Sequence, residues 1–423
     1  MGEPSSPSLS PSLSPTARLP SPAQLAWERF VSRGSSRVGL VVMGLIIAMG
    51  IYAPFLSNEV AVVWWDHQGL RFPAITELFN QRSYTKLHDL FFNVAALLLP
   101  ITLIVLWCLR RWVPPARRVL LFITVVVGGG LICCLPIIPR SSGLSAVWEP
   151  RPFSDATIQR WQELSPNERP FALFAPVKHR FDATYPGAIL QAPGSVNPST
   201  GGTYWLGTDG GGHDVLTILF FGARISLTVG LVAAGLSFFI GVLIGAVSGY
   251  FGGWVDLILQ RIVEIMMCFP TFILILTVVA MLDRSIFIIM AVIGLTGWAG
   301  VARLVRGEFL VQSVRDYVLA AEALGLSRPR IMFRHILPNT VAPLLISLTF
   351  GIAGSIGTES TLAFVGLGDP TVPSWGVLME QGRLNIRYPW LIYTPGLAIF
   401  TIVMTLNLLG NNLRDAIDPK NQR

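Results

Sequence analysis

Residues 225–248 read ISLTVGLVAAGLSFFIGVLIGAVS, a run of 24 residues without a charged side chain. A helix of about 20 apolar residues crosses the hydrocarbon core of a bilayer, since each residue adds about 1.5 Å along the axis. Hydrocarbon offers no hydrogen bonds to the backbone, and a helix forms all of its bonds internally. The stretch therefore predicts a membrane-spanning helix.

Seven further apolar blocks flank this stretch, at residues 38–56, 90–109, 119–138, 262–282, 286–302, 340–358 and 391–410. The chain of 423 residues is 52% hydrophobic and 13% charged, whereas soluble domains carry about 25% charged residues. We predict an all-α, polytopic transmembrane bundle of eight spans, with six as the alternative. The composition excludes a soluble enzyme, a disordered chain and a collagen-like chain.

Basic residues predict the orientation, because loops on the cytoplasmic side carry an excess of Lys and Arg. With the N-terminus inside, the inner segments hold 18 basic and 9 acidic residues, against 13 and 15 outside. We therefore expect both termini in the cytoplasm. The net charge of +7 is then a signal of topology, and we do not expect binding to nucleic acid.

The chain divides into six segments on this interpretation. Residues 1–22 form a disordered Ser/Pro-rich tail, and residues 23–56 form a helix at the membrane surface followed by the first span. Residues 57–89 form an extracytoplasmic loop, and 90–138 form a two-span hairpin. Residues 139–224 form an extracytoplasmic segment that lacks long helices, because prolines recur along it. Residues 225–423 form the core.

The cysteines predict neither a disulfide framework nor a metal site. Cys108, Cys133, Cys134 and Cys268 all lie in apolar blocks, without a CxxC pair or a histidine at ligand spacing. We expect no metal, no cofactor and no catalytic residue in this chain.

A glycine-rich stretch precedes the 225–248 block, and it reads YWLGTDGGGHDVLTILFFGARIS at residues 204–226. Gly207 allows a tight turn, and Asp214 is suited to capping the helix that follows. Asp209, His213 and Asp214 are also candidates for a metal cluster, but capping and turn formation are the favoured interpretation. The stretch lacks the GxxxxGK[ST] pattern of a phosphate-binding loop.

This stretch resembles the sequence before the second core span of permease subunits in bacterial oligopeptide and dipeptide ABC importers. Those binding-protein-dependent inner-membrane components usually carry Arg or Gly where this chain has His213. The resemblance implies a bundle of six core spans of the type I ABC importer kind, to which residues 90–138 add an inserted hairpin.

A second motif lies on the predicted cytoplasmic side, where residues 316–339 read DYVLAAEALGLSRPRIMFRHILPN. The alanines favour a short helix that presents small residues to a close neighbour, and Gly325 is suited to ending it in the left-handed conformation. Pro329 and Pro338 are expected to bracket a second short helix. Taken by itself, the segment would be interpreted as a solvated basic helix-turn-helix.

The same segment resembles the EAA coupling loop of ABC permeases, which docks into a groove on the ATPase subunit. The positions that this motif requires are occupied here by Ala320, Ala321, Gly325, Leu337 and Pro338. Leu319 replaces the glutamate that names the motif, so the salt bridge attributed to that glutamate does not carry over.

Two further stretches extend the resemblance, TLAFVGLGDPTVPSWGVLMEQG at 361–382 and LNLLGNNLRDAIDPK at 406–420. Trp375 in the first is expected to anchor at the membrane interface. Arg261, Glu264 and Pro270 match a family pattern, and Arg261 and Glu264 are three residues apart, which predicts a structural ion pair on one helix face. Glu264 apart, the predicted spans hold almost no ionisable residue.

The resemblance implies a permease subunit that translocates peptides or peptide-like compounds across the bacterial inner membrane. Its implied partners are a second related permease, two ATP-binding subunits or one fused ATPase, an extracytoplasmic binding protein and the lipid bilayer. ATP and Mg²⁺ would bind to the ATPase. The Phe174–Val177 element, FAPV, resembles the Yej-type branch, which is associated with peptides and with antibiotics such as microcin C.

Two other classes of function stay open at this stage. A membrane-embedded hydrolase would use Asp209, His213 and Asp214, and it would be active without partners. An ion-coupled secondary transporter would need ionisable residues deep within its spans.

Overall fold

The computed structural model describes most of the chain, namely residues 22–67, 69–79, 84, 86–111, 114, 117–118, 121–122, 124–130, 157–165, 169–185 and 187–417. The predicted disordered tail, apart from Pro22, lies outside the described residues. So do residues 131–138 of the predicted hairpin, and residues 139–156 of the segment that follows it.

Six described helices are long and apolar enough to cross a membrane. They are α2 (Gly34–Ile51), α5 (Leu87–Cys108), α9 (Val215–Phe251), α12 (Ile286–Ser313), the continuous stretch Arg328–Leu367 and α17 (Trp390–Ile417). A seventh candidate is the pair α10 (Gly253–Cys268) and α11 (Thr271–Met281). The all-helical prediction is confirmed, and without α5 these elements make six core spans when the pair counts as one.

The predicted span at 262–282 is interrupted, because α10 and α11 meet at a bend of 78°. Phe269 is extended there (φ −79°, ψ 133°), as a residue before proline prefers. Pro270 has no N–H to continue the helical hydrogen bonds, so the chain restarts as a new helix at Thr271.

Short elements connect the spans. They are α1 (Pro22–Ser32), α3 (Ala53–Leu56), β1 (Val63–Asp66), β2 (Gly69–Arg71), α4 (Pro73–Glu77), η1 (Leu109–Arg111), η2 (Thr124–Gly128), α8 (Ile158–Glu163), β3 (Phe171–Leu173), β4 (Ser195–Val196), β5 (Thr203–Tyr204), α13 (Asp316–Ala323) and α16 (Trp375–Leu384). The strands form an antiparallel sheet of order β2-β1-β3 and a separate β4–β5 pair.

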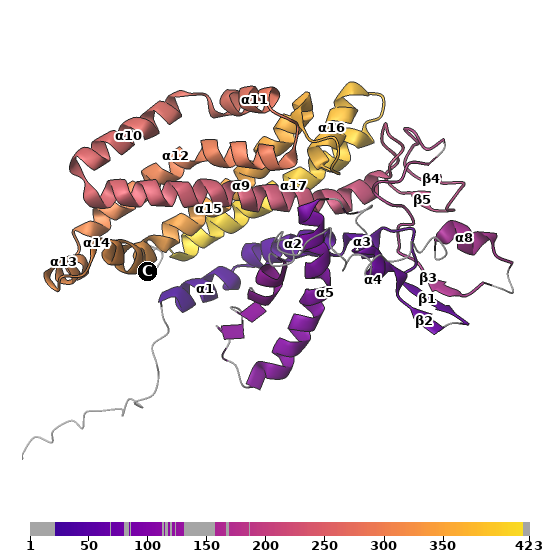
Figure 1. Cartoon of the computed structure of the whole chain (residues 1–423), viewed down its shortest axis with the longest axis horizontal. Coiled ribbons are helices and arrows are strands. Elements are labelled where there is room, and N and C mark those ends of the chain that lie inside the picture. The colour runs from indigo at the N-terminus through magenta and orange to yellow at the C-terminus, as the bar shows by residue number, and fades with distance from the viewer. Residues whose placement is uncertain are drawn as a thin grey trace, which may run out of the picture.

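The bundle has two distinct ends, with all the strands at one and α13 at the other (Figure 1). We call them the β end and the α13 end. Helices α9 and α12 run side by side between them, whereas α5 leaves the bundle and projects away from the other spans (Figure 1).

The N-terminal surface helix is shorter than the predicted 23–37. It ends at Ser32, Arg33 is extended (φ −71°, ψ 130°), and α2 begins at Gly34. Phe30 is buried and Arg33 pairs with Asp415 at 2.6 Å, so α1 is fastened to α17.

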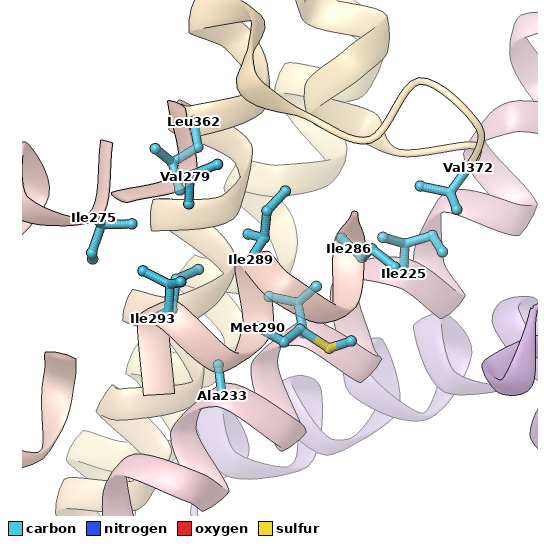
Figure 2. Packing of buried hydrophobic residues seen from close by; sticks show 12 residues of the cluster. Ile225, Ala233, Ile275, Val279, Ile286, Ile289, Met290, Ile293, Leu362 and Val372 are labelled. Carbon is cyan, nitrogen blue, oxygen red and sulfur yellow. The ribbon is translucent and has the colours of Figure 1, made fainter. Parts of the chain in front are cut away.

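Buried apolar side chains gather where α9, α11, α12 and α15 (Leu337–Leu362) approach the β end. Figure 2 shows this β-end cluster, in which Ile286 at the start of α12 lies beside Ile225 of α9. The full cluster is Ile225, Val229, Ala233, Ile275, Val279, Ile286, Ile289, Met290, Val292, Ile293, Leu362 and Val372.

Three glycines let α9 and α12 approach closely. Gly241, Gly245 and Gly249 are four residues apart, so they form one stripe on α9. A Cβ atom on Gly245 would lie 2.4 Å from the carbonyl oxygen of Ala302, and one on Gly249 would lie 2.8 Å from that of Arg306. Small residues at such seams increase van der Waals contact, which holds helices together where lipid removes the hydrophobic drive.

Replacing Gly245 with Leu should destabilise the bundle, because the new side chain would overlap the backbone of α12. Overpacking destabilises a protein by about 1–3 kcal/mol, and we expect a clash with the backbone to cost an amount at the upper end of this range. We expect a lower midpoint of thermal unfolding in detergent. Gly235→Leu is the matched control on the same helix, since a Cβ atom there meets nothing within 4 Å. Equal midpoints for the two variants would contradict the seam.

Candidate functional site

Residues 316–339, the coupling segment, form the α13 end of the bundle. Helix α13 ends at Ala323, and Gly325 follows in the left-handed conformation with φ +72°. The N–H of Gly325 donates to Glu322 O at 2.9 Å, and that of Leu326 donates to Ala321 O at 3.2 Å. This pair of bonds is a Schellman motif, which confirms that Gly325 terminates the helix.

The two predicted contact alanines face opposite ways. Ala321 is buried with Val318 in a core that Ile331, Met332 and Ile336 share with α9 and α12, so the expectation that it is exposed to a neighbour is wrong. Ala320 is exposed. The outward face also carries Leu319 and Leu324, which are 52% and 80% exposed.

The second predicted short helix does not end at Pro338. Helix α14 (Arg328–Arg330), the π-helix η4 (Ile331–Ile336), α15 and the π-helix η5 (Ala363–Leu367) are continuous. Leu337 and Pro338 are the first two residues of α15, directly after the wide turns of η4. Proline lacks an N–H and crowds the carbonyl four residues earlier, and a π-helical stretch relieves that conflict. The coupling segment therefore runs directly into a span.

Polar contacts attach the coupling segment to the bundle. Tyr250, near the end of α9, donates its hydroxyl to Glu322 on α13 at 3.0 Å. The guanidinium of Arg328 lies 5.6 Å from the ring centroid of Phe251. Arg306 on α12 forms a bidentate pair with Asp256 on α10, with both distances 2.6 Å. Three helices therefore meet beneath the segment.

The predicted pair of Arg261 and Glu264 is brought together on α10, with 2.6 Å between Arg261 Nη1 and Glu264 Oε2. Both side chains are at least half exposed, so the pair adds little to stability. Its position on the outer surface of the bundle leaves no buried carboxylate there.

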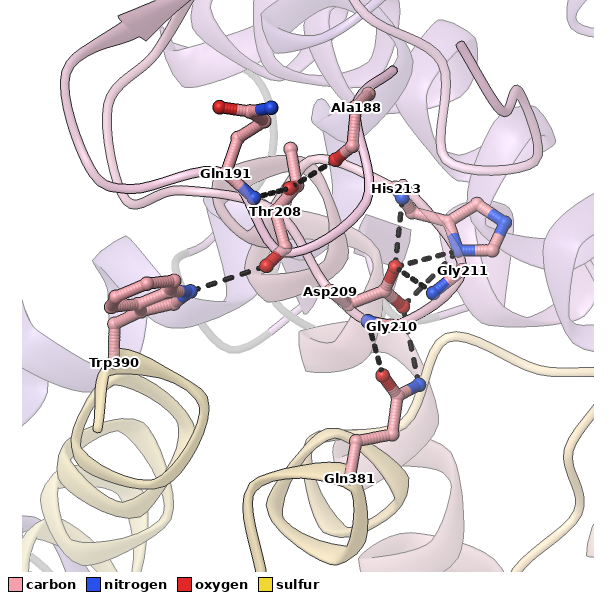
Figure 3. A network of polar contacts seen from close by, with 9 residues as sticks. All are labelled: Ala188, Gln191, Thr208, Asp209, Gly210, Gly211, His213, Gln381 and Trp390. Carbon is pink, nitrogen blue, oxygen red and sulfur yellow. Dashed lines mark hydrogen bonds and ion pairs between the residues drawn. The ribbon is translucent and has the colours of Figure 1, made fainter. Parts of the chain in front are cut away.

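The glycine loop, residues 207–214, lies at the β end and is anchored to two other elements. Figure 3 shows Asp209 accepting hydrogen bonds from the backbone N–H groups of Gly211 and His213, at 2.9 and 2.8 Å. Gln381 on α16 bridges the loop by donating to Asp209 Oδ2 at 3.2 Å and accepting from the N–H of Gly210 at 2.9 Å. Trp390 of α17 donates to Thr208 O at 3.2 Å (Figure 3).

Gly207 is required by this packing. Its φ is +79°, and a Cβ atom would lie 2.7 Å from Gln191 O and 2.9 Å from Trp390 Nε1. At this position, only glycine lets the loop pass between these neighbours.

Asp214 caps α9 as predicted, since its side chain accepts from Thr217 N at 3.3 Å and from Thr217 Oγ1 at 2.7 Å. It is fully buried and lies 3.5 Å from His179 Nδ1. Asp209 and His213 instead contact each other at 3.1 Å. The structure thus separates Asp214 from the pair of Asp209 and His213, and the described residues contain no cluster of three metal-binding side chains.

Two buried ionisable residues were missed because they directly border apolar blocks. Arg224 precedes 225–248 and Glu359 follows 340–358, yet both lie inside helices, α9 and α15, and both are buried. Glu359 accepts from Ser374 Oγ at 2.8 Å, and Arg224 Nε donates to Gly50 O at 2.7 Å. The expectation that the spans hold almost no ionisable residue apart from Glu264 is therefore wrong.

Trp375 is also placed differently from the prediction. It is 1% exposed, and its Nε1 donates to Leu219 O at 3.0 Å on α9. The absent side chain of Gly222 leaves room for the indole, so Trp375 fastens α16 to α9 and does not anchor at an interface.

A cavity of about 190 Å³ lies among α9, α11, α12 and α15. Ile275 and Ile293 separate it from the rest of the β-end cluster. Its wall is mainly apolar, and hydroxyl groups are contributed by Ser237, Thr271, Ser347, Ser355 and Thr358.

The contact between Asp209 and His213 changes the pKa of both groups. Burial raises the pKa of Asp209, but hydrogen bonds from His213 and Gln381 and the charge of His213 outweigh it and lower the pKa overall. The hydrogen bond to Asp209 raises the pKa of His213, against the opposing effect of burial.

These shifts predict a pH-dependent attachment of the glycine loop. A raised histidine pKa stabilises the fold below the unfolded value of 6.5, and that stability is lost as pH rises through the folded pKa. The lowered pKa of Asp209 stabilises the fold above the unfolded value of 3.8. We expect the midpoint temperature of unfolding to decrease as the pH is raised from 6 to 8, because His213 loses its proton.

The control is His213→Arg, which keeps a positive charge at both pH values. The difference between the midpoints at pH 6 and pH 8 should be smaller in this variant than in the natural chain. An equal difference in the two proteins would contradict the assignment to His213.

The sequence matches two descriptions of protein families. "Binding-protein-dependent transport system inner membrane component" matches residues 241–423, and "N-terminal TM domain of oligopeptide transport permease C" matches residues 21–66.

Individual relatives agree with these matches. The dipeptide transport system permease protein DppC of Alkalihalophilus pseudofirmus is 35% identical over 59% of this chain and 81% of its own length. The peptidoglycan transport system permease protein YejE of Agrobacterium fabrum is 39% identical over 65% of this chain and 71% of its length. The inner membrane ABC transporter permease protein YejE of Escherichia coli is 39% identical over 59% of this chain and 72% of its own length.

The first of these family matches includes residues 316–339, and the matches agree with a bundle of apolar helices. They give no support to a hydrolase or to an ion-coupled transporter. The chain belongs to the binding-protein-dependent transport system inner membrane components, the multi-pass permease subunits of ABC importers.

Proposed function

We propose that this chain is one of two related permease subunits that enclose a path for peptides or peptide-like compounds through a bacterial inner membrane. The chain is a transport subunit and not an enzyme, and ATP hydrolysis belongs to separate subunits. The peptide cargo is supported by relatives named for dipeptide, oligopeptide and peptidoglycan transport.

The α13 end faces the cytoplasm on this proposal, with both termini on the same side. The excess of basic residues in the segments at that end supports the orientation, and Arg315, Arg328, Arg330 and Arg334 lie in or next to the coupling segment. The β end is then extracytoplasmic. There a binding protein delivers the peptide to the loops around the glycine loop and α16.

The exposed apolar face of α13 is the observation that carries the coupling role. Leu319 and Leu324 are exposed beside Ala320, while Val318 and Ala321 hold the helix on its own core. Large apolar side chains that share one exposed surface mark a site of protein contact. A groove on each of two ATP-binding subunits, or of one fused ATPase, covers this face.

Transmission follows from the continuity of the chain. The ATPases bind ATP and Mg²⁺, and a change in their spacing moves α13. The motion passes to α15 through the unbroken helix from Arg328 onward, and to α9 through the contact of Tyr250 with Glu322. Rigid elements of this kind transmit a shift between two bodies.

Co-purification tests the proposal. The tagged chain, extracted in mild detergent with its subunits, should bring down a second permease and an ATPase. Leu324→Asp should reduce the amount of ATPase because a charge enters the apolar contact, while the second permease remains. Leu384→Asp is the matched control, since Leu384 is 66% exposed at the opposite end. Recovery of the chain alone would contradict the proposal.

Gly325→Val should uncouple ATP hydrolysis from uptake. A β-branched residue held at φ +72° costs about 1–2 kcal/mol, so the Schellman motif opens and α13 loses its orientation. The predicted effect does not come from a steric clash with neighbouring residues, since a Cβ atom at this position meets nothing within 4 Å. Gly325→Asn should stay coupled, because Asn tolerates this conformation. Proteoliposomes that contain the complete transporter give both rates, and unchanged uptake per ATP in Gly325→Val would refute the coupling role.

A further inference from the structure

Helix α5 lies between the two segments that the family descriptions match, and its two halves have different surroundings. The half near the β end is buried, with Asp89, Phe92, Asn93 and Ala96 packed into the bundle. The other half leaves the bundle and exposes apolar side chains to the surroundings. Membrane spanning alone does not explain why the first half of α5 is buried in the bundle.

Its first contact is with the buried Arg224 of α9. Asp89 Oδ1 lies 3.5 Å from Arg224 Nη1, and the two side chains form an ion pair. The guanidinium also donates to Gly50 O at 2.7 Å and Ile51 O at 3.3 Å, both at the end of α2. A buried arginine is tolerated when it is paired in this way.

Its second contact is with the loop that follows η5. Lys86 Nζ, just before α5, lies 3.7 Å from Asp369 Oδ2. Asp369 is 3% exposed, and the same oxygen accepts from the N–H of Ile286 at 3.1 Å, which is the first residue of α12. The ring of His88 lies 6.3 Å from that of Phe287. The first turn of α5 thus rests against the first turn of α12.

Both contacts border the β-end cluster. Ile225 follows Arg224 directly, Ile286 is bound by Asp369, and Val372 lies three residues beyond Asp369 (Figure 2). The cluster shares Ile275 and Ile293 with the cavity, so the two lie next to each other. Helix ends that move apart here would open the cavity to the extracytoplasmic side.

We propose that the first turn of α5 is a latch that keeps the β-end cluster closed while no cargo is bound. Asp89 and Lys86 are its positioning residues, since they act through Arg224 and Asp369 and not on the cargo. The latch rests on the transport role and the extracytoplasmic location of the β end, and it depends neither on the peptide nature of the cargo nor on the docking of the ATPases.

Cysteine accessibility tests the latch without measuring transport. Val372, which is 4% exposed, is replaced by Cys in a chain whose Cys108, Cys133, Cys134 and Cys268 are changed to Ala. The full chain with its co-purifying subunits is placed in lipid nanodiscs and labelled with a water-soluble maleimide. Lys86→Met should raise the labelling rate by about threefold, which is the scale of a partly exposed ion pair. Asp89→Asn should raise it further, because it leaves Arg224 unpaired.

Three controls separate a latch from general loosening. Lys86→Arg keeps the charge and should label at the rate of the parent chain. Lys178→Met removes a lysine of the same region that takes no part in these contacts, and it should also leave the rate unchanged. Ile336→Cys reports on the buried core of the coupling segment, and its rate should not change in any variant.

The latch is refuted if Lys86→Met does not change the Val372→Cys rate, or if the Ile336→Cys rate rises equally. If the Asp89→Asn chain does not assemble with its subunits, the labelling rates of the Lys86 variants alone test the latch. Loss of ATPase binding or of peptide uptake would leave these rates unaffected, so failure of the latch and failure of the proposed function can be told apart.

Discussion

Inside a bilayer no water is available to the peptide groups of a spanning segment, so each must find its partner within its own helix. Helices that already satisfy their backbones have little to gain from each other except close contact. The stripe of Gly241, Gly245 and Gly249 provides that contact by bringing α9 against the backbone of α12. The other spans pack around this pair, which extends from the β end to the α13 end (Figure 1).

Charge is excluded from the middle of the bundle and collects near its ends. Arg224 lies two to three turns into α9, where carbonyl groups at the end of α2 and the carboxylate of Asp89 receive it. Asp256 and Arg306 form the corresponding pair near the α13 end. Each of these two contacts joins different helices, because a buried charge needs more partners than one helix can offer. The polar residues therefore determine which helices move together.

The two ends have contrasting surfaces. The α13 end presents apolar side chains outward from a helix that is firmly based on its own core, as suits contact with a soluble subunit. The β end is held by polar contacts among loops, in which Asp209, Gln381 and Trp390 join the glycine loop to α16 and α17.

The sequence by itself determined those features that depend on neighbours along the chain. Apolar length predicted the spans, the Asp214 cap and the left-handed Gly325 followed from local backbone chemistry, and a spacing of three placed Arg261 beside Glu264. Only the tertiary structure decided the rest. It turned Ala321 inward and Ala320 outward, buried Trp375, parted Asp214 from Asp209, and extended α9 and α15 to include Arg224 and Glu359. In so apolar a chain, periodicity does not specify how each helix is rotated, and a charge can stay inside a span only when a distant segment supplies its partner.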